Sequence, residues 1–209
     1  SEMCIRDRYK MEHDADALLD KMDGISFVTY NTRPNAMTMG KLGSVEDGGV
    51  MEMDCADWHL ETIQEKNLPV DELSAYNHMA IYLRWCMEHD LMGEEFLAEY
   101  GEVVEKVKAD PAGVDLREFI RDELDGQLVG PMFNKIGRAF AAYYYGAYSN
   151  GQESPFFPSD IDNYAIGVIG QERNYSDEIQ NEAYLFIPFD EDYYQAMAKV
   201  IEERFENWQ

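Results

Sequence analysis

The sequence predicts an α+β fold that is mainly α-helical, a helical bundle-like core with a few short strands near the N-terminus. Apolar residues recur at helical spacing from about residue 54 onward, and glycine and proline separate these segments at short intervals. The β-branched and aromatic run ISFVTY is confined to residues 25–30. An apolar content of 45% with 13% aromatic residues indicates a folded chain despite the high charge.

The first fifty residues differ in sequence pattern from the rest of the chain. The string SEMCIRDR at 1–8 resembles a translated sequencing adapter, an artefact of metagenomic assemblies, and we set it apart from the fold. Residues 11–22 have the pattern of a short helix, 25–30 that of a strand, and the glycine-rich stretch 31–49 that of a loop enclosing a short strand at 37–42. We therefore predict an N-terminal extension or small αβ element at 9–50 and a main helical domain at 51–209.

The first half of the main domain is predicted to contain three helices. Residues 71–90 are apolar nearly all round, which is typical of a central, buried helix. Residues 93–108 are amphipathic, with a row of glutamates opposite the apolar face. Asp115 and Glu118 have the spacing of a capping box that opens a helix at 116–124.

The second half is predicted to be less regular. Pro131 suits the first turn of a helix that runs to about residue 149. Residues 150–182 are expected to be irregular because of Pro155, Pro158, Gly167 and Gly170, and 184–187 are expected to form a short strand. A final amphipathic helix begins at Asp190.

Charge is the strongest global feature, with 42 Asp and Glu against 17 Lys and Arg and a formal net charge of −25. Nucleic-acid backbones and anionic membrane surfaces attract basic proteins, so we expect neither as a partner. A basic protein partner would be attracted by such a field, although an acidic surface also serves solubility alone. Three widely spaced cysteines, no apolar run long enough for a bilayer and no signal-peptide pattern favour a cytoplasmic protein.

Motifs of known chemistry are missing from the sequence. There is no His-x-x-x-His or Cys-x-x-Cys spacing, although Asp54, Cys55, Asp57 and His59 are close enough in sequence to contribute ligands. Neither a nucleophile elbow nor a phosphate-binding glycine loop occurs. The sequence therefore predicts no metal, no cofactor and no catalytic residues.

Aromatic and histidine residues gather in one part of the chain. On a helix, His78 lies one turn from Tyr82, with Trp85 near the same face. The simpler interpretation is a hydrogen-bonded core histidine, and the alternative is a small polar pocket formed by Trp58, His59 and His78. The candidate binding residues are Trp58, His59, His78, Tyr82, Trp85 and Tyr144.

The same residues carry a family resemblance. The motifs are Asp57-Trp58-His59, Leu68-Pro69, Ala75 with His78, Tyr82-Leu83-x-Trp85, Asp125-Gly126-x-Leu128, the helix with Gly137, Phe140 and Tyr143-Tyr144, and the closing segment 192–208. Together they resemble an uncharacterised bacterial domain family of small cytoplasmic proteins, found in the company of polymorphic-toxin immunity genes. The resemblance covers roughly residues 54–208 and implies no catalytic residues.

Three functions follow as hypotheses. The first is a non-enzymatic acidic binding protein, an immunity or antitoxin-type inhibitor of a basic protein toxin, with acidic surface at 88–125 and 153–206 and exposed tyrosines at 143–148 and 156–164 as anchors. The second is a small hydrolase or metal-assisted enzyme using Asp57, His59 and His78, which predicts that these side chains meet in one cleft. The third is an oligomeric structural module.

Overall fold

A computed structural model describes Asn35, Met37 and residues 52–145 and 156–208. This part of the chain is mostly helical and carries one antiparallel pair of short strands, which confirms the mainly α-helical prediction. The helix and strands expected at 11–22, 25–30 and 37–42 lie outside the described residues, apart from Met37. So does the domain boundary expected near residue 50.

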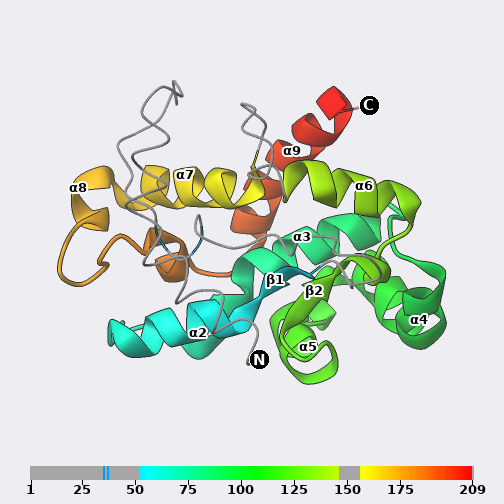
Figure 1. Ribbon diagram of the computed structural model, residues 1–209, viewed down its shortest axis with the longest axis horizontal. Coiled ribbons are helices and arrows are strands. Elements are labelled where there is room, and N and C mark those ends of the chain that lie inside the picture. Colours follow the sequence, from blue (N-terminus) through cyan, green and yellow to red (C-terminus); the bar gives the residue numbers. More distant parts are fainter. Residues whose placement is uncertain (1–34, 36, 38–51, 146–155, 209) are drawn as a thin grey trace.

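Helix α3 (Asn77–Glu88) lies at the centre of the molecule (Figure 1). A 3-10 turn at Glu72–Tyr76 leads into it, and the carboxylate of Asp71 caps this turn by accepting from the Leu73 N–H. Ten of its side chains are buried, on every side of the helix. The central, buried helix predicted at 71–90 is therefore confirmed.

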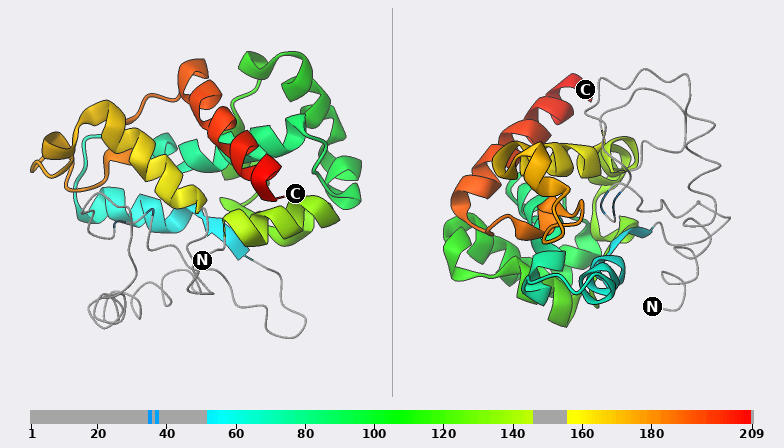
Figure 2. Two further views of the ribbon diagram at one scale, coloured as in Figure 1. Left: turned by 90° about the horizontal axis from the view of Figure 1, so that it is seen from above. Right: turned by 90° about the vertical axis from the view of Figure 1, so that its left-hand side faces the viewer.

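Other helices surround α3. The helices α4 (Glu94–Ala109), α5 (Leu116–Glu123) and α9 (Glu191–Trp208) pack against it, at or within a residue or two of their predicted bounds. Helices α6 (Lys135–Tyr144) and α7 (Phe157–Ile169) form a row above α3 in Figure 1. Figure 2 shows α9 running obliquely across the molecule, where it contacts α3, α6 and α7.

Strands β1 (Glu52–Cys55) and β2 (Gln127–Val129) pair antiparallel, with Asp54 opposite Leu128. Helix α2 (Ala56–Glu65) follows β1 directly. The Ala56 N–H donates to the carbonyl of Gly126, which adopts a φ of 71° in the turn that leads into β2. This turn therefore fixes both the end of β1 and the start of α2.

The prediction of an irregular segment at 150–182 is wrong for most of the described residues in that range. Helix α7 occupies Phe157–Ile169, and the short helix α8 (Gln171–Asn174) follows it. Pro158 lies in the first turn of α7, where its missing N–H costs no helical hydrogen bond, and the chain leaves α7 at Gly170 with a φ of 94°. Gly167 is exposed within the helix and does not interrupt it.

Two further predictions are corrected. Residues Ala183–Phe186 form a 3-10 helix, not a strand, and they pack against α7. Pro131 belongs to a 3-10 turn at Gly130–Met132, and α6 begins only at Lys135, after Asn134 caps it by accepting from the Gly137 N–H. The expected end of this helix near residue 149 lies outside the described residues.

Candidate functional site

Five buried polar side chains from five separate segments meet beside α3. They are Asp54 at the end of β1, His59 on α2, His78 on α3, Tyr145 at the end of α6, and Tyr184 in the 3-10 helix that precedes α9. None of these five residues is more than 4% exposed. We refer to them as the Asp54 cluster.

The local sequence explains why the two histidines point inward. On α2, His59 lies in the buried stripe that also contains Ala56 and Ile63, at positions i+3 and i+7 from Ala56. On α3, His78 belongs to a helix that is buried on every side. Asp54 lies in the paired part of β1, opposite Leu128 of β2, so the strand pairing fixes the position of its backbone.

Both histidines direct the same ring atom at the Asp54 carboxylate. The Nε2 atom of His78 lies 2.9 Å from Oδ2, and the Nε2 atom of His59 lies 3.4 Å from Oδ1. The two imidazole rings are edge to face, with their centroids 4.5 Å apart.

Two tyrosines and a backbone amide complete the cluster. The Tyr145 hydroxyl donates to Oδ2 of Asp54 at 2.6 Å, and the Cys55 N–H donates to Oδ1 at 2.8 Å. The Tyr184 hydroxyl lies 2.7 Å from Nδ1 of His59. The carboxylate is therefore surrounded by groups that can donate, which is the usual condition for burying an ionised carboxylate.

The electrostatics match this geometry. Burial alone would raise the pKa of Asp54, but the nearby His78 and the hydrogen bonds from both histidines hold it well below its usual range, so Asp54 is ionised. Burial and the neighbouring His78 lower the pKa of His59 despite the opposing effect of Asp54. Burial and the Asp54 carboxylate raise the pKa of Tyr145 well above its usual range, so its hydroxyl keeps its proton.

A small pocket borders the cluster on one side. Asp54, His59 and Tyr145 contribute to its wall, together with apolar residues. The remaining lining residues are Met37, Met53, Trp58, Phe156 and Pro158. The sequence suggested a polar pocket formed by Trp58, His59 and His78. Trp58 and His59 line this pocket beside Asp54, but His78 does not, and most of the other lining residues are apolar.

The six candidate binding residues are all buried. His59 and His78 come together in the Asp54 cluster, and Trp58 lines the pocket beside them. Tyr82 packs edge to face on Tyr145 and links this region to the core. Two lie further away, with Trp85 stacked on His89 and Tyr144 bonded to Asp160. None of the six has an exposed side chain.

The enzyme hypothesis named Asp57 as the partner of the two histidines, and the described cluster contains Asp54 in its place. Asp57 is half-exposed in the first turn of α2, where its charge acts on Tyr76. The sequence had placed Asp54 among possible ligands, but it contained no signal for Tyr145 or Tyr184. Those two come from segments about 90 and 125 positions away from their partners, so only the packing brings them in.

Comparison with known protein families gives a match. A family described as Domain of unknown function (DUF7832) matches residues 52–177, which include Asp54, His59, His78 and Tyr145 but not Tyr184 or α9. No curated protein and no solved structure matches the chain. Among the described residues, no helix is long and apolar enough to cross a membrane.

Proposed function

The chain belongs to the DUF7832 family of domains of unknown function, and we propose that it is a non-enzymatic acidic binding protein that captures a basic protein. An immunity or antitoxin-type inhibitor of a basic toxin is the form of this function that we favour. The observation that carries the proposal is the exposed acidic face of α4.

The outer face of α4 carries five exposed glutamates. These are Glu94, Glu95, Glu99, Glu102 and Glu105. Three basic residues of α4 and α5 form ion pairs within the molecule. Lys108 pairs with Asp90, Arg117 with Asp115, and Arg121 with Asp122. Their charges are therefore partly cancelled, and the field outside this face is negative.

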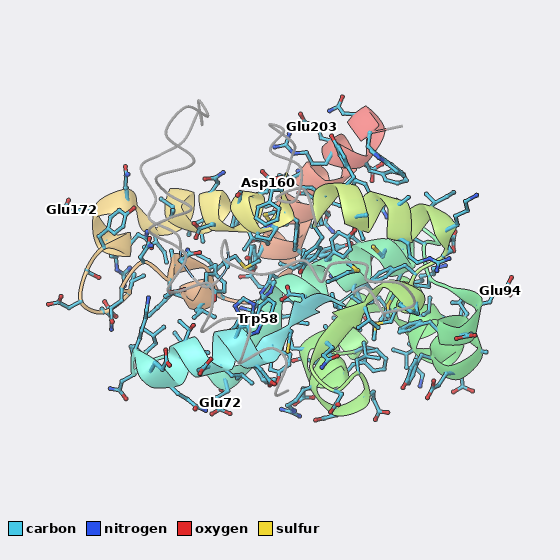
Figure 3. All side chains as sticks on the ribbon, viewed as in Figure 1. Trp58, Glu72, Glu94, Asp160, Glu172 and Glu203 are labelled. Carbon is cyan, nitrogen blue, oxygen red and sulfur yellow. The ribbon has the colours of Figure 1, made fainter. Side chains whose placement is uncertain are left out.

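The acidic surface extends well beyond α4. Figure 3 places the labelled carboxylates Glu94 and Glu172 at opposite ends of the molecule, with Glu72 at its lower edge and Glu203 at its upper edge. A charge spread in this way attracts a basic partner from all directions, and a denser patch then sets the orientation of binding. Leu97, which is 42% exposed on α4, would give the patch an apolar contact.

The tyrosine anchors expected at 143–148 and 156–164 receive less support. Tyr144 and Tyr145 are buried, while the half-buried Tyr143 and Tyr164 are stacked on Trp208 and Tyr193. Residues 146–148 lie outside the described part of the chain. We therefore assign the contact to the carboxylates of α4 and not to these tyrosines.

The test is binding to the basic protein encoded by the neighbouring gene, measured by surface plasmon resonance at several salt concentrations. We expect nanomolar affinity that weakens as salt rises, because screening acts mainly on the association rate. The triple variant Glu95→Gln, Glu99→Gln, Glu102→Gln should associate at least about tenfold more slowly at low salt.

A matched control removes the same number of charges at the opposite end of the molecule, by Glu172→Gln, Asp177→Asn and Glu178→Gln. These residues are also exposed, so the net charge changes equally and only the position differs. Equal slowing in both variants would show that net charge alone acts, without an α4 interface. Failure to recover any basic protein in a low-salt pull-down would contradict the proposed function itself.

A further inference from the structure

Three side chains of metal-ligating type converge in the Asp54 cluster. Asp54, His59 and His78 each offer one ligand atom, and these three atoms lie within 4.8 Å of one another. All three residues are buried, at 4%, 2% and 0% exposure. Surface carboxylates often come close to one another by chance, but two imidazoles and a carboxylate rarely do so in a protein interior.

The spacing of the atoms is that of ligands around one ion. The 3.4 Å between His59 Nε2 and Asp54 Oδ1 is longer than a normal N–H···O hydrogen bond of about 2.7–3.2 Å. Two ligand atoms that each lie about 2.1 Å from a tetrahedral ion are about 3.4 Å apart. His78 Nε2 lies 2.9 Å from Oδ2, and all three ligand atoms are within 4.8 Å of one another, so small side-chain adjustments would let one ion contact all three.

The surroundings also resemble the outer shell of a metal site. A ligating histidine usually has its second ring nitrogen fixed by a hydrogen bond, and Nδ1 of His59 has the Tyr184 hydroxyl at 2.7 Å. A ligating carboxylate is usually hydrogen-bonded as well, and Asp54 accepts from Tyr145 and from the Cys55 N–H. The ring orientation of His59 is thus set before any ion arrives.

Charge balance favours a cation at this point. Within the described structure the groups beside the Asp54 carboxylate are the two imidazoles, the Tyr145 hydroxyl and the Cys55 N–H, and no lysine or arginine forms an ion pair with it there. Nearby, Glu182 is also buried, with its charge partly met by Lys66 at 2.6 Å. A divalent ion held between this carboxylate and the two imidazoles would place positive charge next to a buried negative one.

We propose that Asp54, His59 and His78 bind one divalent first-row transition-metal ion of the Zn²⁺ type, with a further coordination position facing the pocket beside Trp58. Imidazole nitrogens are ligands for such ions and not for Mg²⁺ or Ca²⁺, which prefer all-oxygen sites. The bound ion connects β1, α2 and α3, so it stabilises the centre of the fold. This site is independent of the proposed binding function on α4.

Binding of Zn²⁺ alone to the full chain, stripped with a chelator, tests the proposal. Isothermal titration calorimetry is carried out in a large excess of Mg²⁺, which occupies the exposed carboxylates of this acidic protein. We expect one equivalent of Zn²⁺ to bind tightly and to raise the melting temperature. An anaerobic titration with Fe²⁺ then tells which of the two ions the site prefers, since two histidines and a carboxylate suit both.

Variants identify the ligands. His59→Gln and His78→Gln should each weaken Zn²⁺ binding by at least about 100-fold, and Tyr184→Phe by about 10–100-fold. His89→Gln is the matched control, because His89 is also a histidine of the α3 region but bonds the Trp85 carbonyl and pairs with Glu202. It should keep the wild-type affinity.

X-ray absorption on the zinc-loaded wild-type protein keeps the test decisive where a variant fails to fold. Two imidazole nitrogens in the first coordination shell support the site. An all-oxygen shell, full Zn²⁺ affinity in His78→Gln, or no tight binding by the wild type would each overturn it and leave the cluster as a hydrogen-bonded core network. None of these outcomes depends on finding the basic partner.

Discussion

At the scale of single residues, the interior of this protein contains more ionisable chemistry than its sequence suggested. Asp54 and Asp162 are both buried carboxylates, but their environments differ. Asp54 accepts from the Tyr145 hydroxyl and the Cys55 N–H, has both imidazoles beside it and stays ionised, whereas Asp162 has the amide of Asn35 at 2.8 Å. Burial raises the pKa of Asp162 to about 6, against the opposing effect of the Asn35 hydrogen bond.

Replacing Asp162 with asparagine is therefore expected to stabilise the protein at neutral pH. The folded state keeps the Asp162 proton up to about pH 6, whereas the unfolded chain releases it near pH 3.8, so ionisation costs stability as pH rises through this window. Asp162→Asn should raise the free energy of unfolding at pH 8 by about 1–3 kcal/mol, and the gain should fall away towards pH 4. Urea unfolding at the two pH values measures it.

The control for this prediction is Asp177→Asn, which removes a charge from an exposed position and leaves the interior unchanged. Its effect should stay within about 0.5 kcal/mol at both pH values. A gain for Asp162→Asn that is the same at pH 4 and pH 8 would contradict the assigned cause.

At the scale of helices and strands, the predictions were correct for elements that local apolar periodicity determines. They were wrong for elements whose conformation depends on long-range packing. The central helix and α9 follow from apolar spacing and from caps such as Asp190, which accepts from the Tyr193 N–H. The prediction at α7 was wrong because the prolines and glycines of 150–182, Gly167 among them, favoured an irregular segment. Gly167 is exposed within the helix, where a glycine costs only about 1 kcal/mol, and the break comes at Gly170.

The candidate site was also predicted only in part, because some of its residues come together through long-range packing. Two of its histidines could be selected from the sequence, since both lie among aromatic residues, but their carboxylate was misassigned. Asp57 lies two positions before His59 on α2 and so on a different face of that helix, whereas the extended end of β1 directs Asp54 inward. Tyr184 and His59 are 125 positions apart, so no short-range pattern could have paired them.

Two glycines in helices test the packing at this scale. A Cβ at Gly137 would lie 2.7 Å from the Leu91 carbonyl oxygen and 3.0 Å from Phe133 Cβ, while a Cβ at Gly167 would meet nothing within 4 Å. Gly137→Ala should lower the free energy of unfolding by about 1–3 kcal/mol, because the backbone of α6 must move away. Gly167→Ala should raise it by about 0.5–1 kcal/mol through the helix propensity of alanine. Thermal unfolding of both variants measures the difference, and a stabilising Gly137→Ala would contradict the close approach of α6 to Leu91.

At the scale of the whole molecule, a strongly acidic chain folds around an interior that is largely aromatic and aliphatic. The exposed carboxylates repel one another and oppose the compact state, so the fold depends on its aromatic interior. One cluster of aromatic side chains lies where α3, α6 and α9 meet. In it, Trp85 contacts Phe140 and Phe205, and Trp208 packs on Phe140. Arg84 of α3 adds a bidentate pair with Glu191 and lies over the Tyr194 ring.

This arrangement makes α9 essential to the matched domain, although the family match ends at residue 177. Removing residues 190–209 would expose the surface of α3, α6 and α7 that Tyr193, Tyr194, Met197 and Ile201 now cover. The shortened chain should lose cooperative unfolding and its near-ultraviolet circular dichroism while keeping helical content and binding a hydrophobic dye, because helices remain without fixed packing. In the full chain, Met197→Ala should cost about 2–5 kcal/mol. The exposed neighbour Lys199→Ala should change the free energy of unfolding by no more than about 0.5 kcal/mol. A shortened chain that unfolds cooperatively would mean that residues 52–189 form a complete core and that α9 only covers it.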